Sequence, residues 1–228
     1  MFSCYADIRY SRQAKLLIDE NSPALAQGVF AALHGWNTAV KADDQRIAGS
    51  LPRMTLIETA DDGRIKDLAD CLGLVRVFGR EEAHLDAFLA DHRIGRLVET
   101  GMIKRPRVRE VEIDDDTEFA VYTRDRAADQ LTPAAIDREE RRYARRAKAR
   151  GLERASEEIV RARCGRLAQK NRDDRKLGPK IFVPMRSRST DNPFSLVIRR
   201  EVREAPAEGL LNTYGLSRAD ACIAVPEI

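Results

Sequence analysis

Long apolar runs and cysteine motifs are both missing from this chain. No stretch of about 18 apolar residues occurs, which excludes a membrane-spanning helix, and no membrane partner is expected. Residues 1–10 (MFSCYADIRY) lack the basic start and apolar stretch of a signal peptide. The cysteines stand apart, without a CxxC pair or adjacent histidine, which argues against a zinc site or disulfide framework. They are Cys4, Cys71, Cys164 and Cys222. An intracellular, reducing, cytoplasmic location is therefore expected.

Lysine is also scarce, because 32 of the 40 basic residues are arginines. Residues 1–118 carry 16 basic and 21 acidic side chains, a net charge of −5, whereas residues 119–228 carry 24 and 16, a net charge of +8. Arginine forms planar, bidentate contacts with phosphate and stacks on bases. A basic second half dominated by arginine indicates a nucleic-acid partner.

The first half of the chain predicts an α+β domain. Its pattern favours strands at 5–10, 46–51 and 74–78, helices at 23–33 and 81–89, and extended segments at 96–103 and 105–113. This order of strand, helix, strand, strand, helix and strand is the ferredoxin-like, RRM-like pattern. No aromatic run of the RNP type lies on these strands, so the usual RRM stacking surface is not expected. An acidic turn at 114–116 places the boundary there, giving domains 1–118 and 119–228.

An arginine-rich helix is the strongest signal in the second half. Thr132 and Pro133 form a helix start, and Gly151 ends a helix predicted over 133–150. Five arginines recur at i, i+3, i+4, i+7 and i+8 and share one arc of about 140°. They are Arg138, Arg141, Arg142, Arg145 and Arg146. A solvated charged face is the alternative, but a face of nearly one sign favours contact with nucleic acid.

Few residues suggest chemistry on their own. His34 ends the first predicted helix, in the segment LHGWN, and a structural role is the commoner one for a lone histidine. His84 and His92 fit surface or packing positions. Two strands are expected at 181–185 and 194–200, around a turn whose RSRST segment (186–190) suits phosphate and 2′-hydroxyl groups or is an ordinary polar turn. No P-loop, nucleophile elbow or compact carboxylate cluster occurs, so no metal or cofactor is expected.

Five segments, taken in order, resemble one family. They are LHGWN (33–37), RIAGSLP (46–52), RDRAADQLTPAAIDREERRYARRAKARG (124–151), FVPMRSRSTDNPFSLVIR (182–199) and YGLS (214–217). Together they resemble the CRISPR type I-F repeat-processing endoribonucleases. The resemblance implies a ferredoxin-like N-terminal domain and a smaller C-terminal domain with the arginine helix. It also implies metal-independent cleavage of precursor CRISPR RNA at the 3′ base of the repeat hairpin.

The resemblance further implies roles for individual residues. His34 is the catalytic histidine, Ser187 positions the 2′-hydroxyl, and Tyr214 lies near the histidine. Ser189 and Phe194 line the active site, while Arg124 reads a stem guanine and Arg126 stands where glutamine is common. The helix arginines, above all Arg142, Arg145 and Arg146, enter the RNA groove, with Arg138 and Arg141 beside them.

The expected partners are the CRISPR repeat hairpin and the other subunits of a type I-F Cascade surveillance complex. The main alternative is a non-catalytic protein that binds an RNA hairpin on the same fold. A DNA-binding regulator is less favoured, because the resemblance is to RNA enzymes.

Overall fold

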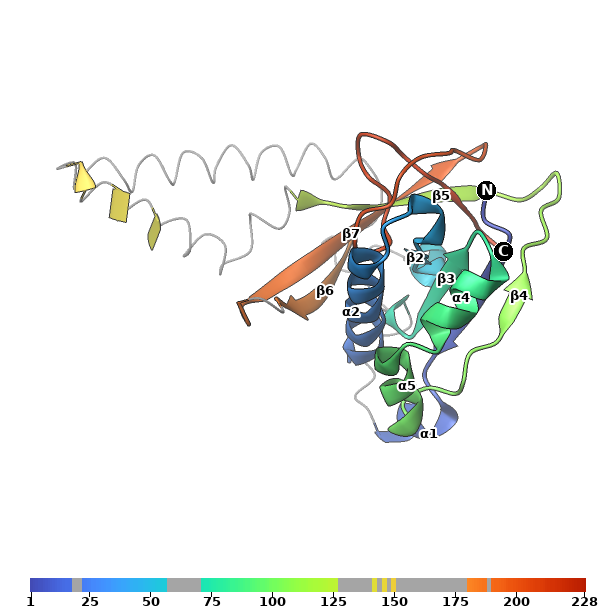
Figure 1. Cartoon of the computed structure of the whole chain (residues 1–228), viewed down its shortest axis with the longest axis horizontal. Helices are drawn as coiled ribbons and strands as arrows, with labels where there is room; N and C mark the ends of the chain where they lie inside the picture. Colours follow the sequence, from blue (N-terminus) through green and yellow to red (C-terminus); the bar gives the residue numbers. More distant parts are fainter. Residues whose placement is uncertain are drawn as a thin grey trace. The chain divides into compact units, whose positions relative to one another are not determined.

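The computed structural model describes residues 1–17, 22–56, 71–126, 141–142, 145–146, 149–150, 180–187 and 190–228 (Figure 1). The chain divides into two compact units. The first contains residues 1–124 and 198–228, and the second contains residues 125–197. The last 31 residues of the chain thus return to the unit that holds its N-terminus.

The first unit is built on a four-stranded antiparallel sheet. Its strands are β1 (Cys4–Arg9), β2 (Ala48–Ser50), β3 (Leu74–Gly79) and β4 (Val108–Glu110), in the order β2-β3-β1-β4. In the register Ala6 lies opposite Val77 and Tyr5 opposite Arg109. Alternate residues of β1 are buried, because successive side chains of a strand point to opposite faces.

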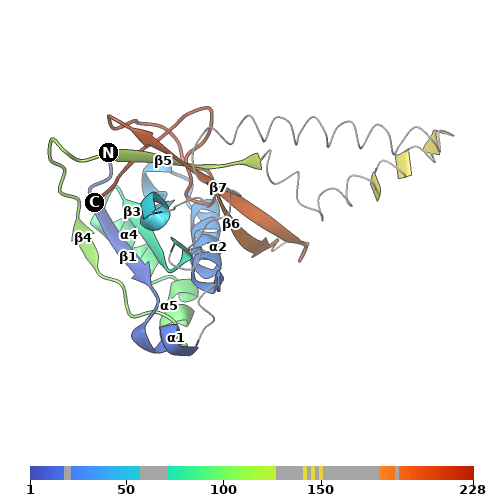
Figure 2. The same ribbon diagram turned by 180° about the vertical axis from the view of Figure 1, so that it is seen from behind.

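Helices cover one face of this sheet. They are α2 (Ala24–Ala39), α4 (Glu82–Leu89) and α5 (His92–Glu99), with the short α1 (Arg12–Leu17) and the 3-10 turns η1 (Asp43–Gln45) and η2 (Pro52–Leu56) between elements. Helices α2 and α4 lie in front of the sheet in Figure 1 and behind it in Figure 2. Leu25, Val29, Phe30 and Leu33 of α2 are fully buried, so the apolar face predicted for this helix forms the core.

The remaining strands form a second antiparallel ribbon. In the first unit β5 (Phe119–Arg124) pairs with the end of β7 (Pro193–Arg203) and with β8 (Val225–Pro226). In the second unit β6 (Lys180–Arg186) lies beside the start of β7 and buries every second side chain. The Lys180 ammonium and the Asp125 carboxylate form an ion pair of 2.7 Å there.

Most of the predicted elements are confirmed, and two predictions are wrong. Strands at 5–10, 74–78, 181–185 and 194–200 and the helix at 81–89 are present, and 46–51 contains the short β2. Residues 96–99 are helical rather than extended, because Asp91 caps α5 by accepting a bond of 2.8 Å from the Arg93 amide while Ile94 is buried. The first helix continues to Ala39 instead of ending at residue 34.

The protein is therefore α+β, with two small antiparallel sheets. The chain leaves the first compact unit after residue 124 and returns to it at residue 198. The sequence predicted a single domain boundary, after residue 118. Residues 57–70 and 151–179, and most of the helix predicted at 133–150, lie outside the described residues. Among the described helices, none is long and apolar enough to cross a membrane.

Candidate active site

The last turns of α2 are locked to the chain that leads into β2. The side chain of Asn37 is buried, and it donates to the Ile47 carbonyl and accepts from the Ile47 amide, each at 2.9 Å. Trp36 donates to the Gln45 carbonyl at 3.1 Å and packs edge-on against Phe88. These contacts keep the helix going past His34, which therefore lies within α2, and not at its end as predicted.

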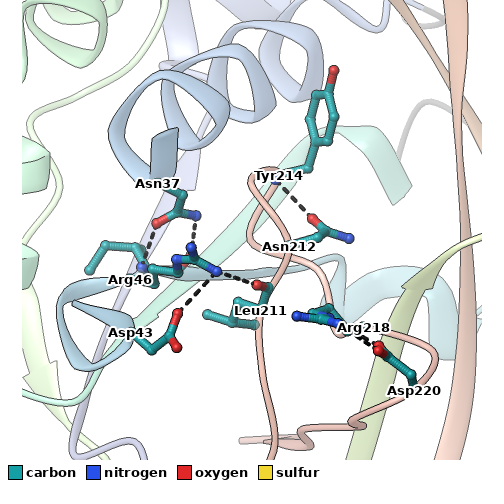
Figure 3. A network of polar contacts seen from close by, with 9 residues as sticks. Asn37, Asp43, Arg46, Leu211, Asn212, Tyr214, Arg218 and Asp220 are labelled. Atoms are coloured by element: carbon teal, nitrogen blue, oxygen red, sulfur yellow. Dashed lines mark hydrogen bonds and ion pairs between the residues drawn. The ribbon is translucent and has the colours of Figure 1, made fainter. Parts of the chain in front are cut away.

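A tight loop over residues 212–217 reaches the same place from the far end of the chain. The side-chain oxygen of Asn212 accepts from the Tyr214 amide at 2.8 Å (Figure 3). It also accepts from the Leu216 amide at 3.3 Å. Gly215 adopts a φ of 73°, in the left-handed region that favours glycine. Its carbonyl accepts from the Gly49 amide at 2.8 Å, which ties the loop to β2.

Arg46 anchors the start of this loop. Its guanidinium donates to the Leu211 carbonyl at 2.7 Å and lies 3.1 Å from the Asp43 carboxylate (Figure 3). The carboxylate holds the guanidinium in position, and the guanidinium holds the backbone just before Asn212. Arg46 belongs to the segment RIAGSLP, whose Ile47 bonds to Asn37 of LHGWN and whose Gly49 bonds to Gly215 of YGLS. Three of the segments that carry the family resemblance therefore contact one another.

These anchors bring His34 against two residues of the loop. The His34 and Tyr214 rings are stacked, with centroids 4.5 Å apart and an interplanar angle of 12°. His34 Nδ1 lies 3.0 Å from Thr213 Oγ1, and the Arg124 guanidinium carbon lies 5.4 Å from the centre of the Tyr214 ring. The order of groups is therefore guanidinium, phenol ring, imidazole and hydroxyl, from three segments distant in the sequence.

The arrangement can transfer a proton. With Nδ1 engaged by a hydroxyl and the ring fixed by stacking, the second imidazole nitrogen has a defined direction. In the described part of the chain no group of three or more histidine, cysteine or acidic side chains forms a metal-binding cluster.

The structure brings together three of the predicted site residues, His34, Tyr214 and Arg124. Thr213 was not predicted, although it directly precedes the YGLS segment. A neutral hydroxyl in a loop gives no sequence signal of its own. Its role becomes visible only when residue 34 and residue 213 are placed side by side.

The second compact unit holds Ser187, Phe194 and Arg126. Ser187 begins the turn between β6 and β7, where its amide donates to the Asn192 carbonyl at 2.9 Å and its carbonyl accepts from the Asp191 amide at 2.8 Å. Phe194 is half-buried near the start of β7, and Arg126 is exposed. Ser189 lies outside the described residues.

The arginine face is partly described. Its visible members are helical and exposed, and Arg145 Nε donates to the Arg141 carbonyl at 3.3 Å, one helical turn back. The visible members are Arg141, Arg142, Arg145 and Arg146; Arg138 lies outside the described residues.

Comparison with protein families gives a match over almost the whole chain. A family model described as CRISPR-associated protein (Cas_Csy4) matches residues 5–227. A search of curated proteins found no match.

Proposed function

Because the chain belongs to the Csy4 family of CRISPR type I-F repeat-processing proteins, we propose that it is a metal-independent endoribonuclease that matures CRISPR RNA. It binds the repeat stem-loop and cleaves at the 3′ base of the hairpin. The observation that carries this proposal is the fixed His34 ring, held between the Tyr214 ring and the Thr213 hydroxyl.

His34 is the general base of the proposed reaction. A neutral imidazole accepts a proton at its unprotonated ring nitrogen, and histidine is the side chain that most often does so in general base catalysis. The imidazole nitrogen that accepts is Nε2, which requires that Nδ1 carries the hydrogen and donates to Thr213 Oγ1. Thr213 is then a positioning residue, which selects the tautomer.

The nucleophile is the RNA's own 2′-hydroxyl. His34 Nε2 takes its proton, the 2′-oxygen forms a bond to the adjacent phosphorus, and the bond from phosphorus to the 5′-oxygen breaks. The departing 5′-oxygen takes up a proton, which leaves a 2′,3′-cyclic phosphate and a 5′-hydroxyl. Since the attacking group is already on the substrate, its alignment matters most, and Ser187 is the residue we assign to it.

RNA recognition falls to the remaining predicted residues. Ser189 and Phe194 line the site near the scissile nucleotide. The helix arginines bind phosphates in the hairpin groove, and Arg124 reads a stem guanine through the two acceptors on the base edge. Its position over the Tyr214 ring supports a base-reading site next to the cleavage site. Arg126 follows Arg124 by two residues and contacts the RNA beside the guanine that Arg124 reads.

The family also supplies the larger setting. Residues 1–118 form a ferredoxin-like domain with the catalytic histidine, which the strand order β2-β3-β1-β4 supports, and residues 119–228 form the RNA-binding part. The protein stays on its product as a subunit of the type I-F surveillance complex.

The test is cleavage of the host's repeat RNA by the purified protein in excess EDTA. We expect cleavage in wild type and a loss of about 10²–10⁴-fold in His34→Ala, with hairpin binding retained. Cleavage restored only by Mg²⁺, or a His34→Ala variant as fast as wild type, contradicts the proposal.

Thr213 is tested by its pH profile. Thr213→Val keeps the shape of the side chain and removes the hydroxyl, so we expect slower cleavage and a shifted pH profile. Thr213→Ser restores both. An unshifted profile in the valine variant limits Thr213 to a packing role.

A further inference from the structure

A basic groove lies on the first unit, on residues that the proposed cleavage does not use. It has a volume of about 340 Å³ and is lined by the end of β1, the start of α1 and the segment that enters β4. Six of its lining residues are cationic: Arg9, Arg12, Lys104, Arg105, Arg107 and Arg109. These are six of the 16 basic residues in a half of the chain that is acidic overall.

The positive charge of the groove is not balanced by its own carboxylate. Asp7 is the acidic lining residue, and it already accepts two bonds from Arg76, at 2.7 and 3.3 Å. Arg9 lies 3.8 Å from the same carboxylate. Within the described part of the chain, no ion pair is formed by Arg12, Lys104, Arg105 or Arg107. Like charges gathered in this way attract an anion.

The spacing of the cations fits a chain of phosphates. Exposed and half-buried residues alternate from residue 105 to residue 109, so Arg105, Arg107 and Arg109 lie on the same side. An extended chain places such residues about 6.6 Å apart. A row of guanidiniums at that interval can contact successive phosphates of one nucleic-acid strand, and arginine binds phosphate through two hydrogen bonds at once.

The two walls of the groove are held together before any ligand binds. Tyr10 forms a β-bridge with Ile103, and Ser11 donates to the Met102 carbonyl at 2.8 Å through its amide and to the Gly101 carbonyl at 2.6 Å through its hydroxyl. The Tyr10 hydroxyl donates to the Ser22 carbonyl and accepts from the Leu25 amide, which fixes the ring in the wall. A fixed aromatic wall beside cations is the usual combination for single-stranded nucleic acid.

We propose that this groove binds the phosphodiester backbone of a single-stranded RNA segment, as a site separate from the hairpin site. The proposal goes beyond the proposed cleavage, since it needs no chemistry at His34.

The test uses the full chain and a short fluorescent oligouridylate. The double variant Arg105→Gln with Arg107→Gln is compared with a control of equal charge, Arg80→Gln with Arg96→Gln, on arginines of the same unit that do not line the groove. We expect binding at least tenfold weaker in the groove variant alone. The slope of the logarithm of the binding constant against the logarithm of the salt concentration (the salt slope) should become shallower by about 1.4. Each single-strand phosphate contact contributes about 0.7 to this slope, and the variant removes two arginines.

Photocrosslinking of a thiouridine-substituted oligouridylate then locates the strand. We expect crosslinks to peptides that contain Tyr10 or residues 104–109. The proposal would be overturned if both double variants lost the same affinity for the oligouridylate, or if the crosslinks were confined to other peptides. It would also be overturned if the groove variant lost the same affinity for a polyglutamate probe. We expect the groove variant to cleave a minimal hairpin at the wild-type rate. The oligouridylate binding test does not depend on cleavage, so a wild-type protein that cleaves nothing would contradict the proposed function and not the groove.

Discussion

The substitution Gly215→Ala tests how the loop at 212–217 is held against His34. Gly215 has a φ of 73°, and a Cβ placed there would lie 2.6 Å from the Ile47 carbonyl oxygen and 3.1 Å from the Gly49 nitrogen. Both of these atoms belong to the backbone, so neither can rotate away. The added methyl must push the loop off β2 and with it Thr213 and Tyr214.

The expected destabilisation has two parts. An alanine in the left-handed region costs about 1–2 kcal/mol by itself. Separation of the loop from β2 adds the loss of the hydrogen bond from the Gly49 amide to the Gly215 carbonyl, about 0.5–1.5 kcal/mol, and the strain of the close contacts. We expect a total of about 2–4 kcal/mol.

Gly101 offers a matched control within the same unit. Its φ is 70°, but a Cβ there would meet no atom within 4 Å. Gly101→Ala therefore carries the conformational cost alone, about 1–2 kcal/mol.

The assay is urea unfolding followed by the fluorescence of Trp36, the chain's single tryptophan, which lies in α2 beside the site. Cleavage is measured on the same samples. We expect Gly215→Ala to lose more stability than Gly101→Ala and to lose most of its cleavage, while Gly101→Ala cleaves normally. Equal unfolding free energies and equal cleavage in the two variants would refute the packing of the loop against residues 47–49.

Two further predictions concern the RNA and the ribbon. Arg145→Ala and Arg146→Ala each lower hairpin affinity about tenfold or more, with a smaller salt slope, because each removes a charge-assisted contact; an unchanged slope means a solvated face. Burial next to Glu227 raises the pKa of Tyr122 well above its ordinary value near 10, so the phenol stabilises the fold fully below that pH and less as the pH rises beyond it. Wild-type stability should fall more steeply above pH 10 than that of Tyr122→Phe, and parallel alkaline denaturation curves would contradict this.

The regular parts of the fold could be predicted from local pattern. The alternation of residues 5–10 predicted β1, and the acidic residues at 81 and 82 predicted the start of α4. The end of α2 could not be predicted, because residues 35–38 are poor helix formers. They are held by contacts outside the helix: Asn37 bonds to Ile47, and Trp36 bonds to Gln45 and packs against Phe88. Helix α5 was missed because its capping aspartate follows the preceding helix almost directly.

The site shows the same division. His34, Tyr214 and Arg124 could be found because they stand in segments that resemble a family. Thr213 could not, since its contact spans 179 residues and its side chain carries no charge. The basic groove was hidden because the acidic total of residues 1–118 masks a local gathering of cations from two separate segments.

The central claim is that the RNA's own 2′-hydroxyl is the nucleophile and that His34 takes its proton. The most direct test removes this one oxygen atom from the substrate. A repeat hairpin with a single 2′-deoxy nucleotide just 5′ of the scissile phosphate is compared with the all-ribose hairpin, for binding and for single-turnover cleavage. The account predicts nearly equal affinity, no cleavage of the deoxy substrate, and products of the ribose substrate that end in a 2′,3′-cyclic phosphate and a 5′-hydroxyl. Cleavage of the deoxy substrate, or a 5′-phosphate on the downstream fragment, would contradict it.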